Sequence, residues 1–282
     1  MSIKLYSDSQ IADKWQYHEQ ISGRVDYFTE SFGQYDLEGR ILFADDEHWP
    51  KTLFIHGARS DYTEMNALLS MMQQQGVSSL SFNLSGHNRC APIDVYHTSL
   101  QQNLQEAERF YQHLSGNLHT VIGHSLGGAL AVKLAVQHPD KVDRLILFCP
   151  AVYADAAYPV AFGRDFTQAI STPFSFLNSE IFDFLKRFKG KLVLVMGQYD
   201  GLPAQNFGKV KGVSAGEVQI KGKKYYSPIP FEVVDKIKDC VSEERLLSLT
   251  IPECDHDIAG WLRQNPEKGQ KLIEEILIFC QN

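Results

Sequence analysis

A serine flanked by glycines stands at a sharp change of pattern near the middle of the chain. Residues 123–127 read GHSLG with Ser125 at the centre, between an apolar run at 118–122 and an apolar stretch at 126–137. A strand that turns directly into a helix strains the residue at the turn and lifts its side chain clear of the sheet. Side chains two positions to either side would collide, so both positions need glycine. The pattern predicts that Ser125 is a nucleophile.

A serine hydroxyl becomes a strong nucleophile only when a base takes its proton, and a third group must orient that base. Asp200 follows an apolar run at 191–196, and His256 follows the last apolar run at 246–251. Of the ten histidines, only His256 lies C-terminal to Asp200. We therefore predict a catalytic triad of Ser125, His256 and Asp200.

Other interpretations of these residues stay open. Asp155 and Asp255 are alternative acids for the same base. Ser125 could also serve only as a helix cap, with His256 as a solvated loop residue. Capping explains the serine, but it does not explain the glycines on both sides of it.

Acyl transfer creates a negatively charged oxygen, which two backbone N–H groups can stabilise. Leu126 directly follows the nucleophile at a helix N-terminus, so its N–H is one expected donor. The other is the N–H of Ala58, in the loop after the apolar run 52–55. His56 and His124 are expected to hydrogen-bond, pack or orient within the site rather than to transfer protons.

Short apolar runs alternate with helical patterns along the chain, which predicts an α/β protein with a doubly wound sheet. Continuous apolar runs are typical of parallel strands buried on both faces. The carboxyl ends of such strands carry the site, and the loops with the candidate residues all lie there. We expect an antiparallel edge from 16–30 and 36–43, strands at 52–55, 77–84, 118–122, 143–148, 191–196 and 246–251, and helices at 61–75, 94–114, 126–137 and the C-terminus.

Two segments interrupt the alternation. The phenylalanine-rich segment 150–190 is too long for a simple connection. We expect it to form a small helical cap on a single core domain made of residues 1–149 and 191–282. A second insertion at 204–230 contains a hairpin pattern. It also carries a group of lysines, expected to form a solvated face, with an anionic substrate tail as the alternative ligand: Lys209, Lys211, Lys221, Lys223 and Lys224.

Taken together, these motifs resemble the α/β-hydrolase superfamily over residues 50–282. The matching pieces are the loops at 56–57, 85–90, 123–127, 197–203 and 255–256. The resemblance implies a mostly parallel eight-stranded sheet with an antiparallel start. Some members carry the acid after the preceding strand, which makes Asp155 the more serious rival. The chain departs from the family at Asn88 and Cys90, where glycine and serine are usual, but asparagine tolerates a left-handed backbone.

The amino-acid composition limits the functions that the protein can have. The 282 residues are 44% hydrophobic and 22% charged, as in an ordinary globular protein with a sizeable core. A net charge of −7 argues against binding nucleic acid or a membrane surface. We expect neither a signal peptide nor a membrane span. The five cysteines are scattered without a C-x-x-C pair, which predicts reduced thiols and a cytoplasmic protein.

Aromatic residues in the cap indicate a pocket for an apolar acyl or aryl group, although at least half should pack the cap onto the core. With serine as the nucleophile, the possible reactions are hydrolysis of an ester, a thioester, an amide or a carbon–carbon bond. We expect a small-molecule ester or thioester substrate, with a C–C hydrolase, an amidase, an acyltransferase or a non-catalytic ligand-binding protein as alternatives. No metal or cofactor is expected, and the oligomeric state is not predicted. The expected substrate contacts are Tyr153, Phe162, Phe166 and Phe174.

Overall fold

An eight-stranded sheet organises the protein in the computed structural model, which describes residues 23–45, 48–88, 91–207 and 215–282. The strand order is β1-β2-β4-β3-β5-β6-β7-β10. Strand β2 pairs antiparallel with both β1 and β4, and all other pairs are parallel. The predicted α/β sheet with an antiparallel start is therefore confirmed. Its strands are β1 (Val25–Ser31), β2 (Asp36–Leu42), β3 (Thr52–Ile55), β4 (Ser79–Phe82), β5 (His119–His124), β6 (Val142–Phe148), β7 (Lys191–Gly197) and β10 (Leu246–Ile251).

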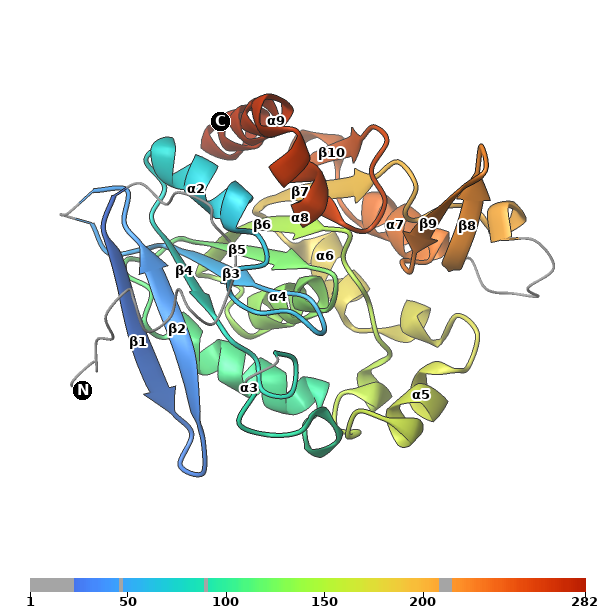
Figure 1. Cartoon of the computed structure of the whole chain (residues 1–282), viewed down its shortest axis with the longest axis horizontal. Helices are drawn as coiled ribbons and strands as arrows, with labels where there is room; N and C mark the ends of the chain where they lie inside the picture. The colour runs from blue at the N-terminus through green and yellow to red at the C-terminus, as the bar shows by residue number, and fades with distance from the viewer. Residues whose placement is uncertain (1–22, 46–47, 89–90, 208–214) are drawn as a thin grey trace.

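The central strands are buried because helices cover both faces of the sheet (Figure 1). Helices α2 (Asn66–Gln74), α8 (Ile258–Gln264) and α9 (Pro266–Gln281) pack against one another on one face. The other face carries α3 (Leu100–Tyr111), α4 (Leu126–Gln137) and α6 (Ile181–Arg187). Helix α4 is apolar nearly all round, and its first ten residues are buried.

Two expected helices are shorter than their patterns indicated. The chain over 61–65 forms turns, in which the N–H of Thr63 donates to the carboxylate of Asp61 at 2.7 Å, and α2 begins only at Asn66. The helix expected at 94–114 is a short 3₁₀ turn at Val95–His97 followed by α3. Ser99 separates the two because its hydroxyl accepts the N–H of Gln102 at 3.2 Å and caps α3.

The segment 150–190 folds into short helices beside the carboxyl ends of the strands. It contains 3₁₀ turns at Asp155–Ala157 and Ser175–Asn178, helix α5 (Arg164–Ile170) and α6. Lys133 of α4 donates hydrogen bonds to Asp155 at 2.7 Å and Glu180 at 2.6 Å, which ties this segment to the core.

Strands β8 (Gly216–Ile220) and β9 (Lys223–Ser227) form an antiparallel hairpin, and α7 (Phe231–Cys240) follows it. The hairpin and α5 lie on the same side of the molecule, beyond the carboxyl ends of the central strands (Figure 1). Lys209 and Lys211 lie outside the described residues, as do residues 16–22 of the strand expected at 16–30. Within the described residues, every helix is too short or too polar to cross a lipid bilayer.

Candidate active site

The turn at Ser125 has the strained geometry that its flanking glycines suggested. Ser125 joins β5 to α4 with φ 53° and ψ −119°. A Cβ atom on Gly123 would overlap the carbonyl oxygen of Gly127, and one on Gly127 would overlap the carbonyl oxygen of Ile55. The N–H of Ser125 donates to Phe148 at 3.0 Å, which ties the turn to the neighbouring strand β6. Close backbone packing therefore holds the serine at the carboxyl end of the central strand β5.

The structure brings Ser125, His256 and Asp200 together from three strand-end loops. Nε2 of His256 lies 2.9 Å from Oγ of Ser125, and its Nδ1 lies 2.7 Å from Oδ2 of Asp200. The other carboxylate oxygen of Asp200 accepts the N–H groups of Gly201 at 2.9 Å and Ile229 at 3.1 Å. The carboxylate is thus fixed, so Nδ1 of His256 carries the proton and Nε2 can accept one from the serine.

The rival acids lie elsewhere and have other partners. Asp155 accepts hydrogen bonds from Lys133 and from the hydroxyl of Ser179 at 3.0 Å. Asp255 accepts the N–H of Tyr226 at 3.0 Å. Asp200 is therefore the acid that contacts the base.

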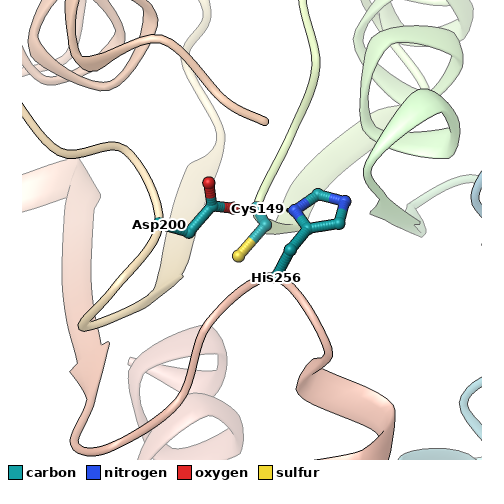
Figure 2. Close-up of side chains that lie close together, drawn as sticks. All are labelled: Cys149, Asp200 and His256. Carbon is teal, nitrogen blue, oxygen red and sulfur yellow. Dashed lines mark hydrogen bonds and ion pairs between the residues drawn. The ribbon is translucent and has the colours of Figure 1, made fainter. Parts of the chain in front are cut away.

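Cys149 lies close to Asp200 and His256; Cys149 and Asp200 are buried, and His256 is partly buried. One ligand-type atom from each lies within 4.8 Å of the others (Figure 2). A metal ion here would need Nδ1 of His256, which already donates to Asp200. Burial raises the pKa of the Cys149 thiol well above its usual range, so it stays protonated, whereas metals bind the thiolate. The group is better suited to hold Asp200 in place than to bind an ion.

Leu126 directly follows the serine, and Ala58 lines the same cavity as the serine. Leu126 is the first residue of α4, where the helix dipole is positive, and Ala58 lies in the loop after β3 and faces the cavity above Ser125. His56 supports this loop: its Nε2 accepts the N–H of Leu84 at 3.0 Å, so its Nδ1 donates to the carbonyl oxygen of Gly57 at 2.7 Å. Burial lowers the pKa of His56, which keeps this doubly hydrogen-bonded ring neutral.

Comparisons with known proteins find a family model, sequence relatives and solved structures that resemble this chain. A model of the family described as "Serine aminopeptidase, S33" matches residues 48–183, just under half of the chain. The match includes Ser125 and Ala58 but ends before Asp200 and His256. A thioesterase domain from the curacin biosynthetic pathway shares the fold across 90% of this chain and all of its own, with a TM-score of 0.59 and 16% identity.

The chain has the α/β-hydrolase fold.

Sequence relatives align with somewhat more than a third of this chain. It is 31% identical over 108 residues to an sn-1-specific diacylglycerol lipase of Mus musculus, covering 38% of this chain and 34% of the lipase. It is 29% identical over 98 residues to an esterase of Mycobacterium tuberculosis, covering 35% of this chain and 32% of the esterase. The alignments thus span about a third of each relative's length. The relatives' names agree with the prediction that the chain is a hydrolase.

A cavity of about 660 Å³ opens above Ser125 and His256. Of the four aromatic residues expected to contact substrate, Tyr153 and Phe174 line it. Phe162 and Phe166 do not. The ring of Phe162 packs on His87 at 5.1 Å and on Phe166 at 4.9 Å, and Phe166 packs behind Tyr153 at 5.6 Å. These two residues support the wall of the cavity from outside, so for them the packing interpretation holds.

The other wall of the cavity comes from residues that the sequence analysis did not single out. Tyr226 of β9 and the stretch Pro228, Ile229 and Pro230 face Ser125 from the hairpin side. Ile170 contributes from the cap. Large apolar side chains stay exposed here, since Tyr226, Ile170 and Phe174 are among the exposed large hydrophobic residues of the described chain. A Pro-x-Pro pattern before a helix was the available signal, because it predicts a rigid extended segment near the strand ends.

Proposed function

We propose that this α/β hydrolase is a serine esterase or thioesterase that acts through an acyl-enzyme on substrates with an apolar acyl group. The observation that carries the proposal is the continuous hydrogen-bonded series from Asp200 through His256 to Ser125, at 2.7 and 2.9 Å. A ligand-binding protein without catalytic activity would have no need of this aligned series at the floor of a cavity.

The geometry supports a two-step mechanism. Oγ of Ser125 attacks the carbonyl carbon while Nε2 of His256 takes the hydroxyl proton, and Asp200 stabilises the imidazolium that forms. The N–H groups of Ala58 and Leu126 stabilise the oxyanion. The intermediate collapses, the bond to the alcohol or thiol breaks, and the leaving group takes the proton from His256. A water molecule, deprotonated by His256, then releases the acid and restores Ser125.

The cavity favours an apolar acyl or aryl group. Its walls include Tyr153, Phe174, Tyr226 and Ile229, of which Phe174 and Tyr226 are also exposed to solvent. Burial of a medium acyl chain there contributes roughly 0.8 kcal/mol for each methylene group. Amide hydrolysis, C–C bond hydrolysis and acyl transfer use the same triad, so the leaving group and acceptor must be determined by assay.

The hairpin lysines do not favour an anionic substrate tail. Lys224 lies 3.3 Å from the carboxylate of Glu217, and Lys223 lies over the ring of Tyr225 at 5.2 Å. These contacts stay within the hairpin, as a solvated lysine face requires.

A cytoplasmic location is also part of the proposal. Four cysteines, Cys149, Cys240, Cys254 and Cys280, are buried free thiols, as expected in a reducing compartment. Cys90 lies outside the described residues. Cell fractionation would test this location.

A substrate panel tests the proposed activity. Wild-type protein and Ser125→Ala would be assayed with p-nitrophenyl esters from acetate to decanoate, the matching acyl-CoA thioesters and acyl anilides. We expect hydrolysis of esters or thioesters, with KM falling as the acyl chain lengthens, and a loss of about 10⁴- to 10⁶-fold in Ser125→Ala. Activity that is restricted to anilides, or equal in both proteins, would refute the proposal.

A further inference from the structure

A second histidine–carboxylate pair lies directly behind the triad. His124, the residue before Ser125, places Nδ1 3.2 Å from Oε2 of Glu64, in the turn region before α2. The contact has the distance of an ion pair, without the direction of a good hydrogen bond. Both side chains are largely buried, so this is a charge pair within the protein rather than on its surface.

The surroundings of the pair favour its charged form. Burial alone would lower the pKa of His124, but the carboxylate of Glu64 outweighs this and raises it. Burial opposes ionisation of Glu64, yet His124 and the N–H of Gly57 lower its pKa to about 2. Asp200 also favours the imidazolium of His124. An imidazolium carries a proton on both ring nitrogens, with Nδ1 beside the carboxylate of Glu64 and Nε2 donating to the carbonyl oxygen of His256.

The pair contacts the three loops that carry the candidate catalytic groups. Oε2 of Glu64 accepts the N–H of Gly57 at 2.8 Å, next to Ala58. Nε2 of His124 donates to the carbonyl oxygen of His256 at 3.2 Å, and His124 is itself part of the turn at Ser125. A Cβ on Gly57 would lie 3.2 Å from Glu64, His124 and Ser125 alike, so the three loops meet here without spare room.

We propose that Glu64 and His124 are positioning residues that hold the Ala58 loop, the Ser125 turn and the His256 loop in register for acyl transfer. This inference rests on the proposed function, because it assigns the pair a role in the same reaction. Neither side chain needs to touch substrate. The pair sets the spacing between the attacking oxygen, the base and the N–H of Ala58. This spacing matters most in the transition state. Loss of the pair should therefore lower kcat more than it changes KM.

The test compares His124→Gln and Glu64→Gln with His119→Gln as the matched control. His119 begins the same strand, is also buried, and binds the hydroxyl of Tyr111 at 2.7 Å and the carbonyl of Ser115 at 3.1 Å, at the far end from Ser125. We expect kcat and the rate of labelling by a fluorophosphonate to fall about 10- to 100-fold in the two test variants. We expect KM to change less than about threefold, and the control to keep both constants.

The pH profile gives a readout that a merely structural role would not move. The rings of His124 and His256 are 5.0 Å apart, and Glu64 and Asp200 are the other charged groups that face His124. His124→Gln removes a positive charge beside the base, so the acidic limb of kcat/KM should move to higher pH by about half a unit or more.

The outcomes separate this inference from the proposed function. A wild-type protein that is not labelled at Ser125 refutes the proposed function. Wild-type labelling with equally fast labelling of both test variants refutes the positioning role. If one variant does not fold, the other decides. Independently of activity, ¹⁵N-histidine NMR should show both ring nitrogens of His124 protonated at pH 7 in the wild type but not in Glu64→Gln. A neutral ring in the wild type would overturn the inference.

Discussion

The carboxylate of Asp155 accepts a hydrogen bond from Nζ of Lys133 at 2.7 Å. Asp155 is the strongest alternative to Asp200 as the acid of the triad, and this contact gives it a different partner. Lys133 comes from α4, whereas Asp155 belongs to the segment above it, so the pair ties cap to core. The carboxylate also accepts hydrogen bonds from Ser179 and from the N–H of Glu180, so its partners are structural. The two aspartates should therefore differ sharply in kinetic tests.

Exchange of each aspartate for asparagine tests that difference. Asp200→Asn should reduce kcat by about 10³- to 10⁴-fold, because the amide no longer holds His256 in the required tautomer. Asp155→Asn should keep kcat within about threefold and at most destabilise the cap, since Asp155 is partly exposed and its ion pair is worth little. Steady-state kinetics on one p-nitrophenyl ester measures both. An essential Asp155 with a dispensable Asp200 would contradict the assignment of the acid.

The buried pair of Glu64 and His124 should leave a signature in the pH dependence of stability. The pKa of Glu64 is lowered from 4.5 to about 2, so its contribution is complete above pH 4.5 and is lost as pH falls toward 2. The pKa of His124 is raised above 6.5, so its contribution is complete below pH 6.5 and is lost as pH rises through the folded value. The pair should therefore stabilise the fold most between pH 4.5 and 6.5.

Urea unfolding of the wild type and Glu64→Gln at several pH values measures this contribution. We expect the variant to lose on the order of 3 kcal/mol of unfolding free energy near pH 5.5, and the difference to shrink as pH approaches 2. A difference that does not change with pH would mean that the two groups are not an ion pair.

Aromatic residues on and behind the cavity wall should respond differently to truncation. Phe174→Ala removes a ring that lines the cavity, so KM for a decanoyl ester should rise several-fold while KM for acetate stays nearly unchanged. Phe166→Ala removes a ring behind the wall, so it should lower stability, with a smaller effect on KM. Kinetics over the ester series with thermal unfolding would separate the two. Equal chain-length effects in both variants would contradict this assignment.

The order of the strand-end loops made most of the site predictable from the sequence. Ser125, Asp200 and His256 each follow an apolar run that became a strand, and parallel strands bring such loops to one edge of the sheet. Helix α7 was missed although Val233, Val234 and Ile237 form an apolar face after Pro230, so its signal was present in the sequence.

Other features depend on contacts between distant residues and have no local signal. Phe162 turns away from the cavity because His87, 75 residues earlier, packs against its ring. Glu64 lies in a polar stretch that reads as the start of a helix, and only the fold brings it to His124. Sequence patterns indicate which residues share an edge of the sheet, whereas side-chain packing decides which of them face the cavity.

Labelling by a fluorophosphonate, followed by mass spectrometry of the intact protein and its peptides, tests the central claim most directly. We expect one adduct per chain on the peptide that contains Ser125, no adduct on Ser125→Ala, and greatly slowed labelling of a His256→Ala variant. A wild-type protein that takes up no label, or a Ser125→Ala protein labelled as readily as the wild type, would contradict this claim.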